Sequence, residues 1–196
     1  MVPEGWAKIR FEEVGGGIKN AIVDGPFGSN LKSEHYRDKG IPVFQSGFVT
    51  DGTFNPTKYV YVDEGLFAQQ YRSAARGGDI LMAKIGAQAG RCAVIPDNHE
   101  EGILAGNSLK ITPAPDSHDR DFILHWLTDH YNRTGLSEIK STTAQPAISI
   151  KNLKRLWFMS PPLPEQRKIA DILSTWDAAI EKTVALLATA KAQKRA

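Results

Sequence analysis

The sequence predicts an α+β protein, with a globular part built on a mixed sheet and one long C-terminal coiled-coil helix. Short apolar runs bounded by Gly, Pro or Asp recur through residues 1–160 and are typical of strands. One amphipathic helix is expected among them. Residues 161–196 instead carry apolar side chains at alternating spacings of four and three, which is the a/d pattern of a coiled coil.

Five segments of the globular part are predicted to be strands, namely 6–11, 58–62, 79–83, 91–95 and 107–112. The predicted helix begins after Ser117, runs to about Arg133 and is ended by Gly135. Its apolar stripe is expected in the core and consists of Phe122, Ile123, Trp126, Leu127 and Tyr131. The alternation of strands with a single long helix in this part favours a mixed sheet.

The start of the C-terminal helix is marked by prolines. Pro161 and Pro162 favour an extended chain, Pro164 suits the first helical position, and Glu165 places negative charge at the positive end of the helix dipole. A helix from Pro164 to the last residue would be about 50 Å long. Its a/d positions, here called the seam, are Ile169, Leu173, Trp176, Ile180, Thr183, Leu187 and Ala190.

The seam requires a partner. No second helix of similar length is predicted, so we expect the seam to pack against another copy of the chain or against a partner protein. The alternative is an ordinary surface helix packed on its own domain. The residues predicted to face the partner are Ile169, Leu173, Trp176, Ile180 and Leu187. We therefore divide the chain into a globular domain, 1–160, and a spacer and dimerisation helix, 161–196.

Composition restricts the class of protein. The 196 residues are 41% hydrophobic and 23% charged, which is typical of a folded soluble domain. The single cysteine, Cys92, excludes an internal disulfide and fits a reducing cytoplasm. No signal peptide and no membrane-spanning apolar run is recognised. The net charge of +2 is too small to indicate nucleic acid, so a DNA-binding hypothesis must depend on local clusters.

Two glycine-containing loops, 24–32 and 84–90, combine backbone freedom with polar side chains that can reach a ligand. Either could contact a phosphate or a base edge. Neither has the spacing of a Walker loop or of a dinucleotide-binding fingerprint. Taken alone, the two loops also fit ordinary tight turns in a β-rich fold.

The order of several motifs is more specific. Along the chain occur Gly25-Pro-Phe-Gly-Ser-Asn-Leu-Lys32, Gly78-Asp-Ile-Leu81, glycines at 86 and 90, Asn107-Ser-Leu-Lys-Ile111, Thr143-Ala-Gln-Pro-Ala-Ile148 and Pro161-Pro-Leu-Pro-Glu-Gln-Arg-Lys-Ile-Ala170. In this order they resemble the specificity (S) subunit of type I restriction-modification systems over nearly the whole chain. The resemblance implies a target recognition domain that binds DNA, followed by a helix that acts as spacer and as docking surface for modification (methyltransferase) subunits.

The resemblance also implies which activities lie elsewhere. Specificity subunits are not enzymes and hold no cofactor, so methylation is expected from the modification subunits, and cleavage from a restriction and translocase subunit if one is present. Such subunits generally carry two recognition domains and two spacer helices, whereas this sequence carries one of each. It resembles half a subunit, and a natural half, a truncated fragment and one arm of a split gene all fit.

If two copies pair their seams antiparallel about a two-fold axis, their recognition domains lie at opposite ends of the paired helices. The target is then expected to have two matching, inverted half-sites. A spacer of about 50 Å corresponds to about 15 base pairs of DNA, which the protein would span without base recognition.

The predicted DNA contacts fall into two groups. Loop side chains whose donors and acceptors suit base edges are Lys32, Gln45, Lys84, Gln88, Thr142, Thr143 and Gln145. Basic side chains expected to bind phosphates are Lys140, Lys151, Lys154 and Arg155. For the second group a solvated basic face is the alternative.

Enzymatic interpretations are weaker. Asp116, Glu138 and Lys140 resemble the carboxylate and lysine set of a metal-dependent nuclease, but they flank a helix and do not lie on a central strand. Residues 55–59 resemble an amino-methyltransferase motif without the glycine-rich cofactor loop. The histidines form no metal set, since His125 and His130 do not share a helix face. The remaining alternative is a protein-interaction or regulatory half-subunit that does not bind DNA.

Overall fold

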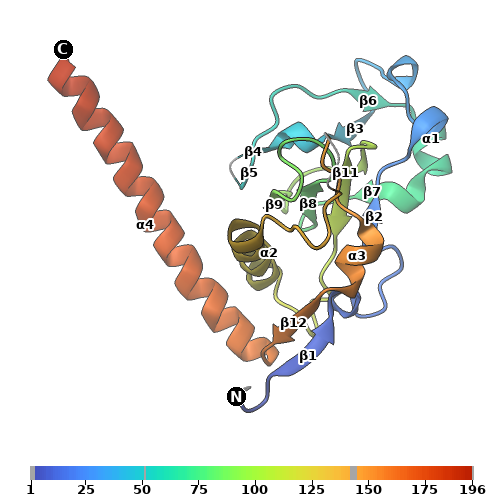
Figure 1. Cartoon of the computed structure of the whole chain (residues 1–196). Coiled ribbons are helices and arrows are strands. Elements are labelled where there is room, and N and C mark those ends of the chain that lie inside the picture. Colours follow the sequence, from blue (N-terminus) through green and yellow to red (C-terminus); the bar gives the residue numbers. More distant parts are fainter. Residues whose placement is uncertain (1–2, 51, 142–144, 196) are drawn as a thin grey trace.

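A computed structural model describes residues 3–50, 52–141 and 145–195. It consists of a globular body and a long helix, α4 (Leu163–Arg195), which leaves one end of the body and diverges from it (Figure 1). The other helices are shorter and belong to the body: α1 (Glu64–Gln69), α2 (Arg120–Thr134) and α3 (Ile150–Arg155). The fold class is therefore α+β with a long C-terminal helix, as predicted.

The strands form several small sheets. One four-stranded sheet is antiparallel, in the order β2 (Ile22–Asp24), β11 (Ser108–Ile111), β8 (Ile80–Ala83) and β9 (Cys92–Val94). The other is mixed, because β3 (Ile41–Phe44) and β10 (Gly102–Leu104) are parallel, whereas β6 (Tyr61–Val62) and β7 (Ala74–Ala75) flank them antiparallel. Two pairs complete the set, β1 (Ala7–Arg10) with β12 (Trp157–Ser160) and β4 (Val49–Thr50) with β5 (Thr53–Phe54).

The predicted strands are present, but they do not form one sheet. Those predicted at 79–83, 91–95 and 107–112 correspond to β8, β9 and β11 of the antiparallel sheet. The strand predicted at 58–62 is reduced to β6 in the mixed sheet, and the one at 6–11 pairs with β12. Strand pairing depends on contacts between distant segments, which the local sequence does not specify.

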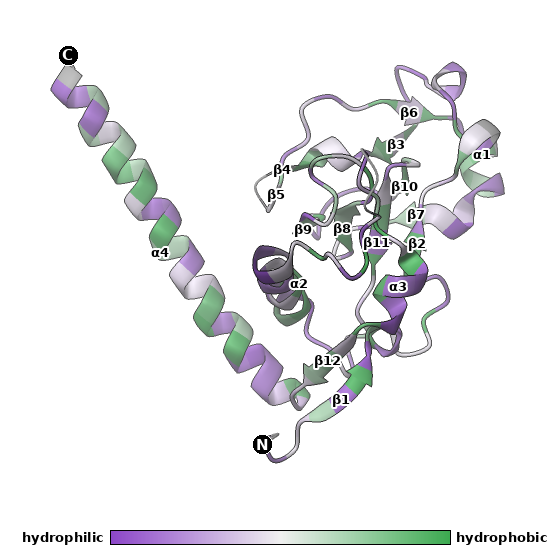
Figure 2. Cartoon of the chain, viewed as in Figure 1, coloured by the Kyte–Doolittle hydropathy of each residue, from purple (hydrophilic) through white to green (hydrophobic). Residues whose placement is uncertain are grey.

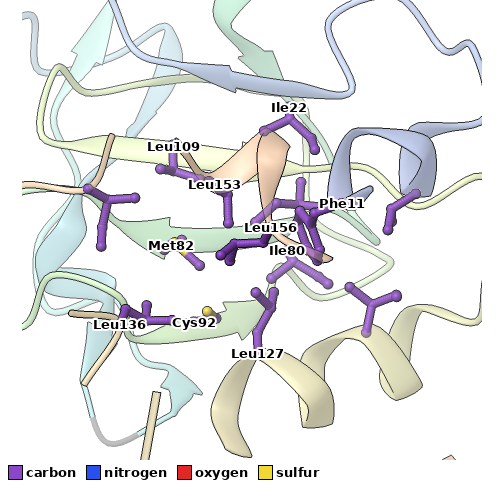
Figure 3. Packing of buried hydrophobic residues seen from close by; sticks show 14 of the residues in the cluster. Phe11, Ile22, Ile80, Met82, Cys92, Leu109, Leu127, Leu136, Leu153 and Leu156 are labelled. Carbon is purple, nitrogen blue, oxygen red and sulfur yellow. The ribbon is translucent and has the colours of Figure 1, made fainter. Parts of the chain in front are cut away.

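The main core lies between the antiparallel sheet and the helices. Because side chains alternate along a strand, Ile80, Met82 and Leu109 point to one face, where Leu127 of α2 and Leu153 of α3 cover them (Figure 3). The opposite face contributes Leu81 and Ala83 to a second buried cluster with residues of the mixed sheet. Both faces of the antiparallel sheet are therefore buried, and the functional loops must lie at its edges and ends.

Helix α2 has the boundaries that its caps predict. Asp119 accepts a hydrogen bond from the backbone N–H of Phe122 at the start, and Gly135 adopts a left-handed conformation at the end. The expected core stripe is confirmed for Phe122, Ile123 and Leu127, which are buried. Trp126 is only partly buried and stacks on Phe11, with ring centroids 5.4 Å apart.

Helix α4 begins one residue earlier than predicted, at Leu163, so that Pro164 is its second residue. Its 33 residues correspond to about 50 Å. The first turns pack on the body, where Gln166 and Ala170 are buried and Ile169 lies against the main core. From Asp171 to Lys194 every residue is exposed. None of the helices in the described ranges has the length and apolar character that crossing a bilayer requires.

Candidate nucleic-acid interface

Asp24, the last residue of β2, is the centre of an ion network at one end of the antiparallel sheet. Its carboxylate lies 2.6 Å from Nζ of Lys84 and 2.9 Å from the guanidinium of Arg72. The side chains of Asp24 and Lys84 are mostly buried, whereas that of Arg72 is exposed. The hydroxyl of Ser73 also donates to the carbonyl of Asp24. This network fixes the points where the two glycine-containing loops leave the sheet.

The backbone of Lys84 brings further loops together. Its N–H donates to the carbonyl of Asn107, and its carbonyl accepts from the N–H of Ile148, each over 2.8 Å. Two residues later, the N–H of Gly86 donates to the carbonyl of Pro146. The loops 25–32, 84–91, 105–107 and 145–149 thus converge, and we call them the loop cluster. Each contains part of one of the motifs that carry the family resemblance.

Two glycines are required by this convergence. A Cβ on Gly25 would lie 2.0 Å from the carbonyl oxygen of Ala105, and a Cβ on Gly106 would lie 2.7 Å from that of Pro26. No side chain can occupy either position without moving backbone. The close approach of loops 25–32 and 105–107 therefore depends directly on glycine.

Phe27 lies at the surface of the loop cluster. The residue is 46% exposed, and Nζ of Lys84 lies 3.6 Å from the centroid of its ring. The contact is a cation–π interaction, in which the ammonium of Lys84 holds the orientation of the ring. An exposed aromatic ring held in this way offers a flat face on which a sugar or base can pack.

The predicted base-contacting residues lie at different places relative to the loop cluster. Gln88 and Gln145 are exposed within the loop cluster. Gln45 lies next to it, since the N–H of Ser46 is 3.5 Å from the side-chain oxygen of Asn107. Lys32 ends loop 25–32, with its ammonium 3.6 Å from Glu34. Thr142 and Thr143 lie outside the described residues.

Lys84 lies at the start of the predicted loop 84–90, but its side chain is not free at the surface. Its ammonium is mostly buried between Asp24 and Phe27, where it neutralises a carboxylate. A role in base contact stays a prediction, and it would require that this ion pair open.

The predicted phosphate contacts form two groups. Lys140 belongs to the loop segment that pairs with Ile148, and its ammonium lies 4.9 Å from the ring centroid of Tyr131, where partial burial lowers its pKa. Lys151, Lys154 and Arg155 lie on α3. Lys154 lines a hollow of about 330 Å³ together with Arg72, so the second group continues toward the Asp24 network.

The residues of the nuclease and histidine-metal interpretations make other contacts in the structure. The Glu138 carboxylate lies 2.5 Å from Nε2 of His130, and His130 stacks on Trp126. His125 contacts α4, with Nε2 3.2 Å from the hydroxyl of Ser174. Neither a nuclease carboxylate set nor a histidine metal site is assembled by these described residues.

The second candidate surface is the outer part of α4. The seam residues beyond the first turns are exposed: Leu173 by 40%, Trp176 by 66%, Ile180 by 58% and Leu187 by 54%. Figure 2 shows apolar bands along this helix where it stands away from the body. Ile169 is the exception, because it packs on the body's own core. The helix is thus not simply packed on its own domain, and its row of exposed apolar side chains is typical of a surface that a partner covers.

The loop cluster and most of α4 lie in the region that this chain shares with known proteins. A family model described as the type I restriction modification DNA specificity domain matches residues 3–189, which include the loop cluster and most of α4. The chain belongs to this family. The resemblance predicted from the motif order is therefore confirmed.

Individual relatives of this specificity domain agree. Two relatives are specificity subunits of type I restriction enzymes from Methanocaldococcus jannaschii. MjaX, whose assignment is provisional, is 26% identical over 97% of the chain, and MjaVIII is 23% identical over 92% of it. A chain in a structure of a type I restriction-modification system aligns with a TM-score of 0.70 at 27% identity over 99% of this chain. The specificity domain spans 44%, 41% and 43% of these three proteins, which is less than half of each.

Sequence reasoning missed Phe27 of the loop cluster and two residues of the ion network, Asp24 and Arg72. Asp24 and Phe27 lie in or beside a loop that was recognised, and the signal was a carboxylate directly before Gly25 and an aromatic residue between two glycines. Arg72 had no local signal. It enters the network because the segment around Tyr71–Ser73 packs beside the end of β2.

Proposed function

We propose that this chain is the DNA-recognition half of a type I specificity subunit, has no catalytic activity of its own, and directs modification subunits to a bipartite DNA site. The observation that carries the proposal is the convergence of the family-motif loops around Asp24 and Lys84, with Gln88 and Gln145 exposed among them. Methyl transfer and any cleavage are assigned to partner subunits. The reducing cytoplasm inferred from the single cysteine remains a prediction.

Within the loop cluster, positioning and base recognition are assigned to different residues. Gln88 and Gln145 present amides that match adenine in the major groove. Gln45, next to the loop cluster, and Lys32, at the end of loop 25–32, are assigned further base contacts. Phe27 packs against the nucleotide next to these contacts. Lys140, Lys154 and Arg72, with exposed Lys151 and Arg155, bind phosphates and orient the domain without specifying sequence.

Replacing Gln88 or Gln145 with Ala should change which sequence is recognised while leaving the fold intact, because both side chains are exposed. A lost bidentate base contact costs about 1–3 kcal/mol of discrimination, or roughly 5- to 150-fold. Binding of the variants to a library of duplexes measures the effect. The matched control is Gln69→Ala, an exposed glutamine at the end of α1. Variants that retain the full sequence preference would contradict base contact by these amides.

For α4 we propose two neighbours. The seam from Leu173 to Leu187 pairs antiparallel with a second copy of the chain, which places two recognition domains about 50 Å apart. A second apolar row, Ile172, Ala179 and Leu186, repeats every seven residues beside the seam. Ile172 is 59% exposed and Leu186 is 71% exposed. A two-stranded coiled coil covers mainly the a and d positions, so this row remains for helices of the modification subunits.

The two neighbours can be separated by mutation. Ile172→Asp together with Leu186→Asp should leave the mass of the dimer unchanged. The double variant should weaken capture of the modification subunit at least tenfold, because it loses two apolar contacts that are each worth about 1.5 kcal/mol or more. Pull-down of a purified cognate modification subunit measures the second effect. Loss of the dimer with capture unaffected would reverse the assignment of the two rows.

The proposed function is tested by mapping methylation in cells that carry this chain and a cognate modification subunit. We expect a new motif with two inverted, matching halves separated by an unspecified spacer of about 15 base pairs. A stable complex that methylates no such motif would favour the alternative, a protein-interaction or regulatory half-subunit.

A further inference from the structure

The first turn of α4 is attached to the body by one buried amide. Gln166 is fully buried, and its Nε2 lies 2.8 Å from the carbonyl of Pro161, 3.1 Å from that of Ser117 and 3.2 Å from the hydroxyl of Ser160. Its side-chain oxygen accepts from the N–H of Asp119 over 2.9 Å. Because Asp119 is the N-cap of α2, this amide connects the starts of two helices with the end of β12.

Glu165, the residue before Gln166, makes a second attachment, to the N-terminal segment. Both carboxylate oxygens of Glu165 lie 3.1 Å from Nε1 of Trp6, which donates to them. Trp6 immediately precedes β1, and β1 pairs with β12, the strand that leads into α4. The N-terminal segment therefore braces the same turn.

A third attachment lies two turns further along. His125 of α2 places Nε2 3.2 Å from the hydroxyl of Ser174 and Nδ1 3.7 Å from the carboxylate of Asp177. Between these polar contacts, Ala170 is buried and Ile169 packs on the main core. The contacts involve successive turns of α4, so they restrain its direction as well as its position.

We infer that these contacts form a rigid elbow, in which Gln166 and Glu165 act as positioning residues that set the angle between the long helix and the recognition domain. The consequence for DNA rests on the proposed function: the distance between two half-sites would be determined by this angle as well as by helix length. Ala190 lies about 36 Å beyond Gln166, so a change of roughly 10° displaces it by about 6 Å, nearly two base-pair steps.

The angle can be measured without DNA. Nitroxide labels at Ala192→Cys, which is exposed and lies opposite the seam, and at Ser137→Cys report the distance between the outer helix and the body, and Cys92 is buried and stays unlabelled. Dilution with unlabelled protein removes distances between copies. We expect one narrow distance distribution for the unmodified elbow. Gln166→Met keeps the length of the side chain but loses its hydrogen bonds, so we expect a roughly twofold broader distribution at the end of a lever of about 39 Å. An unchanged width in the folded variant would overturn the elbow.

Two variants of Glu165 test the elbow independently of whether Gln166→Met folds. Glu165→Ala removes the acceptor of Trp6, whereas Glu165→Gln retains an acceptor oxygen at the same position. The distribution should broaden with Ala and stay narrow with Gln. Equal widths for these two variants would contradict a positioning role for Glu165, whatever the stability of the Gln166 variant.

The DNA consequence is measured with duplexes whose half-sites are separated by different spacers. The unmodified protein should prefer one spacer by roughly tenfold over spacers one base pair longer or shorter, because each added pair also rotates a half-site by about 35°. Gln166→Met should reduce this preference to roughly threefold. Absence of DNA binding by the unmodified protein would refute the proposed function alone, whereas a full spacer preference in the variant would refute the elbow.

Discussion

Replacing Trp176 and Ile180 with Asp should convert a dimer of this chain into a monomer. Both side chains are exposed residues of the seam of α4. Burying such a side chain stabilises an interface by about 1.5–3 kcal/mol, and the change also places uncompensated carboxylates at a and d positions. With two copies per interface, association should weaken by several orders of magnitude. Light scattering should report a fall from twice 21.6 kDa to 21.6 kDa.

The control carries the same charges on the other face of the helix. Ala178 and Ala185 are seven residues apart and lie roughly opposite the seam at about 100° per residue. Ala178→Asp with Ala185→Asp should leave the dimer intact, because these positions face water in a two-stranded arrangement. A dimer that survives the seam variant, or dissociates equally in the control, would contradict pairing through the seam.

Replacing Lys84 with Met should destabilise the body and remove sequence-specific DNA recognition together. The Lys84 and Asp24 side chains are only 11% and 14% exposed, so the change leaves a carboxylate with little water. Removing one partner of a buried ion pair costs about 3–5 kcal/mol, and Arg72 compensates part of this because it keeps its contact with Asp24. The support of Phe27 is lost at the same time. Urea denaturation measures the free energy of unfolding.

Arg72 provides a matched comparison at the same carboxylate. Its side chain is 59% exposed, and exposed ion pairs contribute about 0–1 kcal/mol. Arg72→Met should therefore change the free energy of unfolding little, while weakening DNA binding through loss of a phosphate contact. Equal destabilisation by Lys84→Met and Arg72→Met would show that the buried pair is not the support of the loop cluster.

The local sequence predicts elements whose signals are themselves local. Helix α2 is bounded by Asp119 and Gly135, and α4 follows a run of prolines, so both helices are located to within a few residues. The strands of the antiparallel sheet are equally visible as short apolar runs. Their distribution over separate sheets is not visible, because it depends on which distant segments pair.

The candidate site depends more strongly on long-range contacts. Asp24 meets Lys84 across 60 residues and Arg72 across 48. Gln88, Gln145 and Lys84 could all be selected from their residue type and their motifs, but the structure shows that the side chain of Lys84 is mostly buried. Residue type indicates what a side chain can bind, whereas burial decides whether it is available to bind it.

The sequence by itself determined the family, the α+β class and the presence of an apolar stripe on a long terminal helix, because motif order, caps and helical periodicity are properties of neighbouring residues. Only the tertiary structure decided that Ile169 belongs to the body, that the exposed stripe starts at Leu173, and that Gln166 and Trp6 brace the helix. Trp6 and Glu165 are 159 residues apart. Contacts at such separations arise from the packing of the whole chain, which no local pattern encodes.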